Sequence, residues 1–461
     1  MSKLTKKKII FLSTLFCLFL IVFLIFTYIL FPINSVLLFD FGEINIGFCD
    51  NKTVLTKLEE EIDKFEYKLI TVDGNEYTVK LNDVIDPIDI NKLENKVNGL
   101  KKKFWANKYN LSIEDLFVYN DDKINAVLNE IKQNMGEDIE SVDACIVYDK
   151  NIKAFKIEEE KYGNIFKSDA CNILKNELTT LSKDINLFEI GCYIPPNIFS
   201  DDEVLHENLL KYNEYQGKNI VYIFGENKEE LNLDIYQSWL IPNLDENNRL
   251  NNEEPFSIKE DLVKEYVKGL SSKYNTLGKS RTFKTSTDET VEILKGDYGW
   301  WLNENKMIED IINLISNKES IEKEAIFKQK AECFGDTDFT NSYVEVSIEK
   351  QHLWMYVNGN LVIDCPVVTG CVSKGHSTPK GIYSLTYKTK NAVLRGPGYA
   401  SPVSYWMPFN GGVGLHDATW RGSFGGTIYK TNGSHGCVNI PLKAAKVVYE
   451  NLTYTMPIIV W

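Results

Sequence analysis

The sequence predicts a multidomain protein with an N-terminal transmembrane helix, α+β spacer modules and a mostly-β domain at the C-terminus. Three observations support this fold class. Residues 9–31 contain no charged side chain, the middle of the chain alternates between helical and strand-like patterns, and residues 340–461 read as short strands separated by glycine-containing turns. A chain of 461 residues is also long enough for several domains.

The N-terminal segment from Ile9 to Phe31 is dominated by Ile, Leu and Phe. Its length suits a bilayer, which takes about 20 apolar residues to cross. Four of residues 1–8 are lysines, and the next basic residue after the segment is Lys52, so the positive-inside rule leaves the N-terminus in the cytoplasm. A cleaved signal peptide would have a shorter apolar core and a small-residue cleavage site. We therefore expect an uncleaved, single-pass anchor with the body of the protein outside.

Charge is spread unevenly along the chain. The net charge is −14, yet residues 340–461 contain ten Lys and Arg against five Asp and Glu, which leaves +5 there and −19 elsewhere. This balance argues against nucleic acid as a partner, whereas a basic C-terminal domain suits a substrate that carries carboxylates. The nine cysteines are irregularly spaced and do not form a disulfide scaffold pattern. Cys365 and Cys371 are close enough to pair, although nothing in the spacing requires it.

The middle of the chain predicts helices and hairpins. Residues 67–72 and 77–81 flank Asp73-Gly74, a dipeptide typical of a tight hairpin turn. Residues 88–100 and 262–274 place apolar side chains at helical intervals, and both contain Val-x-Gly-Leu, which we interpret as an internal duplication. The charged segment from Lys318 to Lys330 is predicted to be helical.

From Tyr343 onward the pattern changes to strands. Residues 343–349 alternate with period two, residues 352–357 lead to Asn358-Gly359, and residues 361–370 follow as the next strand. This spacing predicts a β-sandwich or barrel-like domain.

The candidate catalytic residues lie in the hexapeptide Ser434-His-Gly-Cys-Val-Asn439 and at His416, which is separated from Ser434 by seventeen residues. A cysteine is a nucleophile as thiolate, and an imidazole can supply the deprotonation that a thiol of pKa about 8.5 needs. Gly436 permits unusual dihedral angles, so that the backbone N–H groups of residues 435–437 can meet a developing oxyanion. A metal site is disfavoured, because zinc typically takes four ligands in paired spacings that are missing around His435 and Cys437.

This signature resembles that of the L,D-transpeptidases with a YkuD-type catalytic domain, the cysteine enzymes that cross-link peptidoglycan. The resemblance covers residues 340–461 and includes earlier motifs at Val346-Ser347, Gln351, 366–370 and 378–381. It implies that Cys437 is the nucleophile and His416 its proton partner, with Asp417 orienting His416 through main chain or side chain. It further implies that Ser434, His435, Gly436 and Asn439 support the loop and the oxyanion; many members have arginine in place of Asn439. Trp420, Tyr405 and Trp406 would either wall the substrate pocket or belong to the core.

The implied reaction is 3→3 cross-linking. The Cys437 thiolate attacks the third residue of a stem tetrapeptide, D-Ala leaves, and the amine of a neighbouring stem resolves the thioester. Two alternatives are an L,D-carboxypeptidase that uses water and a wall-binding protein without activity. The resemblance implies peptidoglycan stem peptides as donor and acceptor, no cofactor, no metal, acylation by carbapenems, and a catalytic domain in the cell wall of a bacterium, held to the membrane by residues 9–31.

Residues 273–284 and 291–303 resemble the module that precedes the catalytic domain in membrane-anchored L,D-transpeptidases and is assigned to peptidoglycan binding. Tyr298, Trp300 and Trp301 are predicted to form either the core of this module or an aromatic shelf for a sugar.

In the catalytic domain, the glycine-rich segments Gly411-Gly412 and 422–426 are predicted to be either lids over the thioester or simple turns. The predicted organisation is a cytoplasmic tail (1–8), a transmembrane anchor (9–31), a linker (32–50), an α+β module (51–200), a peptidoglycan-binding module (201–335) and the catalytic domain (340–461).

Overall fold

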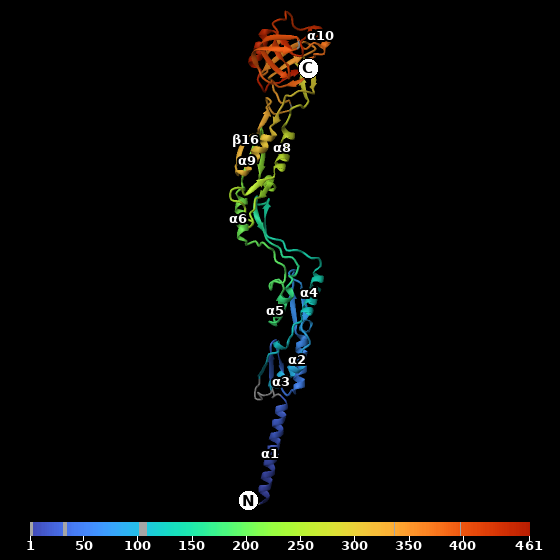
Figure 1. The fold of residues 1–461 in the computed structure, drawn as a ribbon, viewed down its shortest axis with the longest axis vertical. Helices are drawn as coiled ribbons and strands as arrows, with labels where there is room; N and C mark the ends of the chain where they lie inside the picture. The colour runs from blue at the N-terminus through green and yellow to red at the C-terminus, as the bar shows by residue number, and fades with distance from the viewer. Residues whose placement is uncertain (1–2, 31–34, 101–107, 336, 397) are drawn as a thin grey trace. The chain divides into compact units, whose positions relative to one another are not determined.

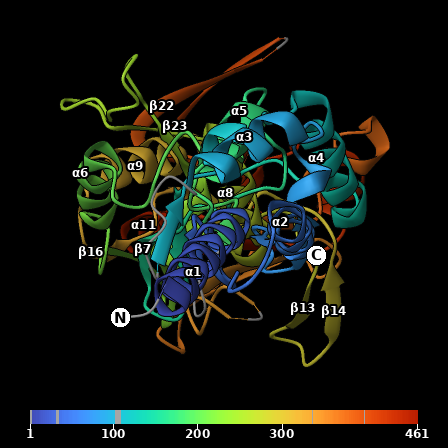
Figure 2. The same cartoon turned by 90° about the horizontal axis from the view of Figure 1, so that it is seen from below.

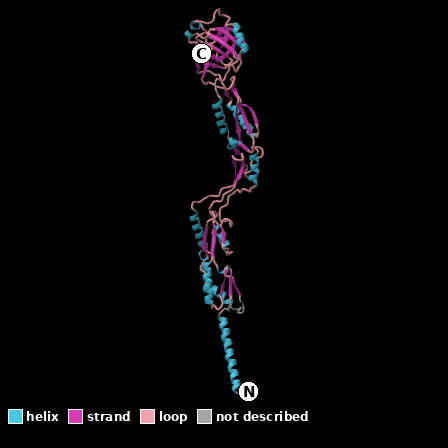
Figure 3. Cartoon of the chain, turned by 180° about the vertical axis from the view of Figure 1, so that it is seen from behind, coloured by secondary structure: helices cyan, strands magenta, loops and turns pink. Residues whose placement is uncertain are grey.

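The computed structural model describes residues 3–30, 35–100, 108–335, 337–396 and 398–461. It divides into two compact units, of which unit 1 is residues 1–147 with 157–206 and unit 2 is residues 148–156 with 207–461. Helices and strands alternate through the middle of the chain, whereas the C-terminal part is rich in strands (Figure 1, Figure 3). The predicted fold class is therefore confirmed. The predicted domain boundaries stay predictions.

The N-terminal helix α1 runs over Lys3–Ile29. Within the described residues it is the single helix that is long and apolar enough to cross a membrane, and its side chains from Lys7 to Phe26 are exposed. Phe31, the last residue of the predicted span, lies outside the described residues.

Unit 1 is built from short sheets and helices around one apolar core. The predicted hairpin is confirmed, since β3 (Glu66–Ile70) pairs antiparallel with β4 (Glu76–Lys80) and Gly74 in the turn has φ +80°. The predicted helix at 88–100 is α3 (Ile90–Leu100). The other elements are β1 (Val36–Phe39), β2 (Gly42–Asn45), α2 (Asn51–Lys64), β5 (Lys108–Leu111), α4 (Asp121–Met135), α5 (Ala170–Leu178) and β8 (Asp184–Asn186). Strands β6 (Cys145–Asp149) and β7 (Ala154–Glu158) fall partly in unit 1 and partly in unit 2.

The first part of unit 2 repeats the topology of unit 1. Hairpin β9–β10 is followed by helices α8 and α9 and then by β16, which pairs parallel with β9. In unit 1, hairpin β3–β4 is followed by α4 and α5 and then by β8, which pairs parallel with β3. This shared topology agrees with an internal duplication. The predicted correspondence between residues 88–100 and 262–274 does not follow it, because α8 is the second of the three described α-helices between the hairpin and the parallel strand, as α4 is in unit 1, whereas α3 is the first. The elements are α6 (Glu203–Asn213), β9 (Asn219–Phe224), β10 (Asn227–Asn232), α7 (Leu233–Tyr236), β11 (Leu240–Pro242), β12 (Phe256–Ile258), α8 (Glu260–Tyr274), β13 (Arg281–Lys284), β14 (Thr290–Ile293), β15 (Trp301–Leu302) and α9 (Glu304–Ser316).

The charged segment 318–330 is not helical, contrary to the prediction. It forms strands β16 (Ile321–Glu324) and β17 (Phe327–Gln329), which pair with β9 and β15. Helix α9 ends before it, since Lys318 has φ +55°. Strand pairing here overrides the helix propensity of Glu and Lys, and charged side chains are common on an edge strand.

The C-terminal domain consists of two sheets that share one apolar core. The five-stranded sheet has the order β20-β19-β18-β26-β21 and the four-stranded sheet the order β22-β23-β24-β25. The predicted strands and the Asn358-Gly359 turn are present, and Figure 2 shows hairpin β22–β23 as a long pair of strands. The elements are β18 (Tyr343–Ser347), β19 (His352–Val357), β20 (Asn360–Pro366), β21 (Gly381–Tyr383), β22 (Thr389–Gly396), β23 (Tyr399–Asn410), β24 (Val413–Asp417), α10 (Ile428–Asn432), β25 (Val438–Ile440), α11 (Leu442–Asn451) and β26 (Ile458–Val460).

Residues 295–298 extend the five-stranded sheet at its β21 edge. The Ile382 N–H donates to Lys295 O at 2.9 Å, and the Tyr298 N–H donates to Ile382 O at 3.2 Å. Gly296 has φ +128°, and a Cβ there would overlap the Ile382 carbonyl. The last part of the preceding module is therefore continuous with the C-terminal domain.

Tyr298 and Trp300 belong to the core at this junction, since their exposed fractions are 0% and 7%. The shelf interpretation is therefore wrong for Tyr298, which is fully buried. Trp301 is 40% exposed, and the Lys328 ammonium lies 4.5 Å from the centre of its ring.

Candidate active site

A cavity of 480 Å³ opens beside the four-stranded sheet of the C-terminal domain. Most of its walls come from hairpin β22–β23 and from the loops next to β24 and β25. Five of the predicted site residues reach it together with Trp406 and Trp420. Its lining comprises Tyr387, Thr389, Ala392, Val393, Leu394, Arg395, Tyr399, Ser401, Trp406, Gly412, His416, Trp420, Arg421, Gly433, Ser434, His435, Cys437 and Asn439.

Two adjacent parallel strands bring the motif residues together. β24 and β25 pair with His416 directly opposite Asn439, and Cys437 immediately precedes β25. His416 is 3% exposed. Its side chain reaches the cavity because alternate residues of a strand point to opposite faces. Two residues that are 23 positions apart in the sequence, His416 and Asn439, are thus direct neighbours in the sheet.

The Cys437 thiol is partly exposed, and its Sγ lies 3.6 Å from the carbonyl oxygen of Gly412. Burial raises the pKa of Cys437 to about 11, and a hydrogen bond from the Gly414 backbone offsets part of that rise. Within the described residues, no hydrogen bond joins Cys437 to His416. The thiol is therefore neutral near pH 7 in the free protein.

The His416 ring is held on both nitrogens. Its Nδ1 lies 2.8 Å from the Asp417 carbonyl oxygen, and its Nε2 lies 3.0 Å from Asn439 Nδ2. Burial lowers the pKa of His416, and the hydrogen bond to Asp417 acts in the opposite direction. Asp417 contacts the ring through its main chain, because its carboxylate accepts the Tyr405 backbone N–H at 2.8 Å.

The loop before the cysteine is tied down by side-chain hydroxyls. Ser434 Oγ donates to Cys437 O at 2.5 Å and accepts the Gly436 N–H at 3.0 Å, and Thr378 Oγ1 donates to Gly436 O at 2.7 Å. Gly436 has φ +123°, which explains the glycine. Because the Gly436 N–H is already bonded to Ser434, the predicted set of three converging N–H groups is reduced to those of His435 and Cys437. The His435 ring stacks on Tyr399 with centroids 4.8 Å apart.

The aromatic residues predicted near the site divide into two groups. Trp420 is 51% exposed with its ring 6.0 Å from that of His416, and Trp406 lies 5.8 Å from His416 on the other strand. Both line the cavity. Tyr405 does not, because its ring faces Tyr449 of α11 at 5.3 Å, as expected for a neighbour of Trp406 on a strand.

Of the two glycine-rich segments near the site, Gly411-Gly412 reaches the cavity and residues 422–426 do not. Gly412 lines the cavity and accepts the thiol contact, as described above. Residues 422–426 do not line it, and the Gly425 N–H is bonded to Val367 O at 2.9 Å. This segment is a turn fixed to the five-stranded sheet.

The sequence reasoning missed several lining residues, among which Tyr387, Arg395, Tyr399 and Arg421 have the largest side chains. Tyr387, Arg395 and Tyr399 come from hairpin β22–β23 and the loop before it, whose path across the cavity no local pattern reveals. Arg421 follows His416 by five residues, and this proximity was the one available signal. Within the described residues, no group of three His, Cys, Asp or Glu side chains is placed to hold a metal ion.

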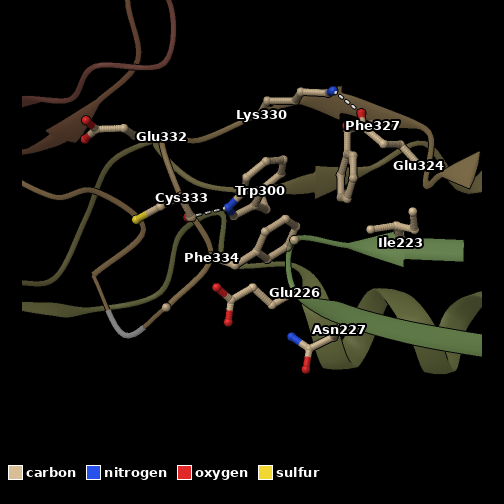
Figure 4. A pocket seen from close by; sticks show the side chains of 12 residues that line it. Ile223, Glu226, Asn227, Trp300, Glu324, Phe327, Lys330, Glu332, Cys333 and Phe334 are labelled. Carbon is tan, nitrogen blue, oxygen red and sulfur yellow. Dashed lines mark hydrogen bonds and ion pairs between the residues drawn. The ribbon is translucent and has the colours of Figure 1, made fainter.

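A second cavity, of 520 Å³, lies in the preceding module (Figure 4). Trp300 stacks on Phe334 with centroids 3.9 Å apart and donates through Nε1 to Cys333 O at 2.8 Å. Lys330 pairs with Glu324 at 2.9 Å. Its lining includes Cys333 but no histidine, so it lacks the cysteine–histidine pair that lines the cavity around Cys437.

Two models of known families match parts of this chain. Residues 341–460 match the model of the L,D-transpeptidase catalytic domain, YkuD, and residues 199–322 match a model described as a proposed peptidoglycan-binding domain. A search of curated proteins gave no match.

Solved structures similar to this chain are L,D-transpeptidases. The catalytic domain of the Enterococcus faecium enzyme, solved by NMR, is 36% identical; the match covers 27% of this chain and 98% of that one, with a TM-score of 0.25. A crystal structure of a cysteine-to-serine mutant of the E. faecium enzyme is 27% identical over 55% of this chain and 100% of that one, with a TM-score of 0.42. The E. faecium catalytic domain has also been solved acylated by ertapenem.

Proposed function

Because the chain belongs to the L,D-transpeptidases with a YkuD-type catalytic domain, we propose that it forms 3→3 peptidoglycan cross-links through a thioester on Cys437. The observation that supports this most is the pairing of β24 with β25. This pairing sets His416 opposite Asn439, two residues after Cys437, and both His416 and Cys437 line the same cavity.

The proposed acylation begins from a neutral pair. His416 takes the thiol proton as the donor stem enters, because the raised pKa of Cys437 keeps thiolate scarce beforehand. The sulfur attacks the carbonyl carbon of the third stem residue, and the peptide bond to D-Ala breaks. His416 returns the proton to the leaving amine. The N–H groups of His435 and Cys437 are the proposed donors to the oxyanion.

Deacylation reverses the roles. The side-chain amine of an acceptor stem gives a proton to His416, attacks the thioester carbon and releases the Cys437 sulfur, which is reprotonated. Arg395 and Arg421 add positive charge to the cavity wall, which suits stems that carry carboxylates.

We further propose that α1 is an uncleaved membrane anchor and that the catalytic domain works in the cell wall. The helix is long and apolar enough to span a bilayer. Tethering raises the effective concentration of acceptor stems around the catalytic domain and so favours amine over water. The mass of the protein extracted from membranes checks the anchor, since cleavage after residue 31 would remove the whole segment.

The balance between transpeptidase and carboxypeptidase is tested on a trapped acyl-enzyme. Purified Cys437 thioester is mixed with acceptor stem bearing a free side-chain amine, and the ratio of cross-linked to hydrolysed product is measured. We expect the amine product to dominate at millimolar acceptor. If water dominates there, the protein is an L,D-carboxypeptidase.

A further inference from the structure

Another cavity, of 790 Å³, lies where the preceding module joins the C-terminal domain. Its walls are residues 291–295, at and just after the end of β14, and residues 379–381 with Tyr383 around β21; Asn410, Val460 and Trp461 complete the lining. The two walls are joined by a hydrogen bond of 2.9 Å from the Ile382 N–H to the Lys295 carbonyl oxygen. We call this cavity the junction groove.

Two lysines line the junction groove, one on each wall. Lys295 and Lys380 are exposed, and among the described residues neither ammonium group makes an ion pair or a hydrogen bond. Their backbones run close together: a Cβ on Gly381 would come within 2.9 Å of the Lys295 carbonyl oxygen and within 2.7 Å of the Tyr383 hydroxyl. Two uncompensated positive charges are thus anchored on adjacent chains.

The rest of the lining is mostly apolar. Leu294, which is 62% exposed, and Val460 contribute aliphatic surface, and Glu292 is the one acidic side chain in the described lining. Binding sites for small molecules typically combine apolar walls with a few polar groups that fix the orientation of the ligand. The two ammonium groups outnumber the carboxylate, so the groove favours an anionic ligand over a cationic one. A peptide that carries carboxylates fits both properties.

The junction groove lies close to the cysteine loop. Thr378, just before one wall, donates to the Gly436 carbonyl oxygen at 2.7 Å. Asn410 lines the groove and precedes by two residues Gly412, whose carbonyl oxygen is 3.6 Å from Cys437 Sγ. Since an extended residue spans at most about 3.3–3.6 Å, Asn410 lies within roughly 13 Å of the sulfur. A stem of three or four residues covers that distance.

We propose that the junction groove binds the acceptor stem peptide, with Lys295 and Lys380 holding its carboxylates. The proposal rests on the proposed function, because it assigns a place to the second substrate. The donor stem occupies the cavity around Cys437, and the acceptor extends from the groove past the turn at Gly411-Gly412 to bring its side-chain amine to the thioester. Glu292 opposes the acceptor carboxylates.

The test compares three variants with the wild type, each as the full chain in detergent. Lys295→Gln/Lys380→Gln removes both cations, and Glu292→Gln removes the opposing charge. Lys268→Gln/Lys443→Gln is the matched control, because it removes two exposed lysines outside the groove, one from α8 and one from α11. Far-UV circular dichroism and thermal unfolding establish that each variant is folded.

The first readout is the rate of cross-linking at saturating donor tetrapeptide and varied acceptor tripeptide. We expect the groove lysine variant to raise the half-saturating acceptor concentration by roughly threefold to tenfold, the range of two partly exposed ion pairs, with the maximal rate and the donor dependence unchanged. Glu292→Gln should lower that concentration by about twofold, and the control should leave it unchanged. An unchanged acceptor dependence in the folded lysine variant, or a change in the donor dependence, would overturn the proposal.

The second readout is binding of the acceptor tripeptide to Cys437→Ala by titration calorimetry, with its carboxylates free or converted to amides. We expect the free form to bind roughly threefold to tenfold more tightly, and this preference to disappear when the two groove lysines are also replaced. Equal binding of the two forms would refute the site. If lysine-dependent binding is found but the wild type makes no cross-links, the proposed function fails and the groove remains a stem-binding site. If cross-links form without any dependence on the lysines, the groove fails and the proposed function stands.

Discussion

The protonation state of Cys437 in the free protein gives a sharp prediction. With a pKa of about 11, about one thiol in a thousand is ionised at pH 8, whereas an ordinary thiol of pKa about 8.5 is ionised in about one case in four. Alkylation by iodoacetamide follows the thiolate. We therefore expect Cys437 to react on the order of 100-fold more slowly at pH 8 than an ordinary exposed thiol, with a rate that keeps rising up to about pH 11.

The assay is timed alkylation followed by peptide mass mapping of the full chain. Cys145 on β6 is an internal control, since it is exposed and lies outside the C-terminal domain. Acylation by a carbapenem should behave differently, because His416 then acts as base on the bound complex. His416→Ala should abolish most carbapenem acylation while leaving the slow alkylation nearly unchanged. Alkylation of Cys437 as fast as that of Cys145 would mean a preformed thiolate–imidazolium pair and would refute the neutral-pair mechanism.

Three further predictions concern stability and the site. Gly296→Ala should lower the free energy of unfolding by about 3–5 kcal/mol, from backbone strain plus two lost hydrogen bonds. Gly278→Ala is the control, since Gly278 also has a positive φ (+74°) but has open space around its Cβ, and it should cost about 1 kcal/mol. Equal losses of the two variants in thermal unfolding would argue against residues 295–298 as part of the sheet. Arg281→Met should cost about 3–5 kcal/mol because it leaves Asp338 buried without its partner. Adding Asp338→Asn, which removes the unpaired charge and tolerates the positive φ of this position, should recover part of that loss in denaturant unfolding. A harmless single variant would contradict the buried pair. Ser434→Ala frees the Gly436 N–H and the Cys437 carbonyl, so we expect slower carbapenem acylation with little change in unfolding temperature, and an unchanged rate would remove Ser434 from the support of the loop.

Local patterns predicted those parts of the fold that depend on local physics. Asp73-Gly74 and Asn358-Gly359 predicted their hairpins correctly, because Gly74, Asn358 and Gly359 take the positive φ that these turns need. The segment 318–330 was misread, because its strands exist only through pairing with β9 and β15, which lie far away in the sequence. A strand that depends on such distant pairing partners cannot be predicted from its own sequence.

The candidate site divides in the same way. Cys437, His416 and Asn439 were found from their spacing, and the parallel pair β24–β25 explains that spacing. For Tyr405 and Trp406 the sequence left open whether each faces the pocket or the core, and strand alternation directs Trp406 to the cavity and Tyr405 to α11. The hydrogen bond from Arg421 to Asn439 depends on the path of a loop, which no motif encodes.

The central claim is that Cys437 transfers the acyl group of one stem peptide to the amine of another. It is tested most directly by mass spectrometry of muropeptides incubated with the full-length protein and with Cys437→Ala. The account predicts dimers joined 3→3 and released D-Ala with the wild type, and unchanged muropeptides with the variant. Dimers formed by Cys437→Ala, or a wild type that leaves the muropeptides unchanged, would contradict it.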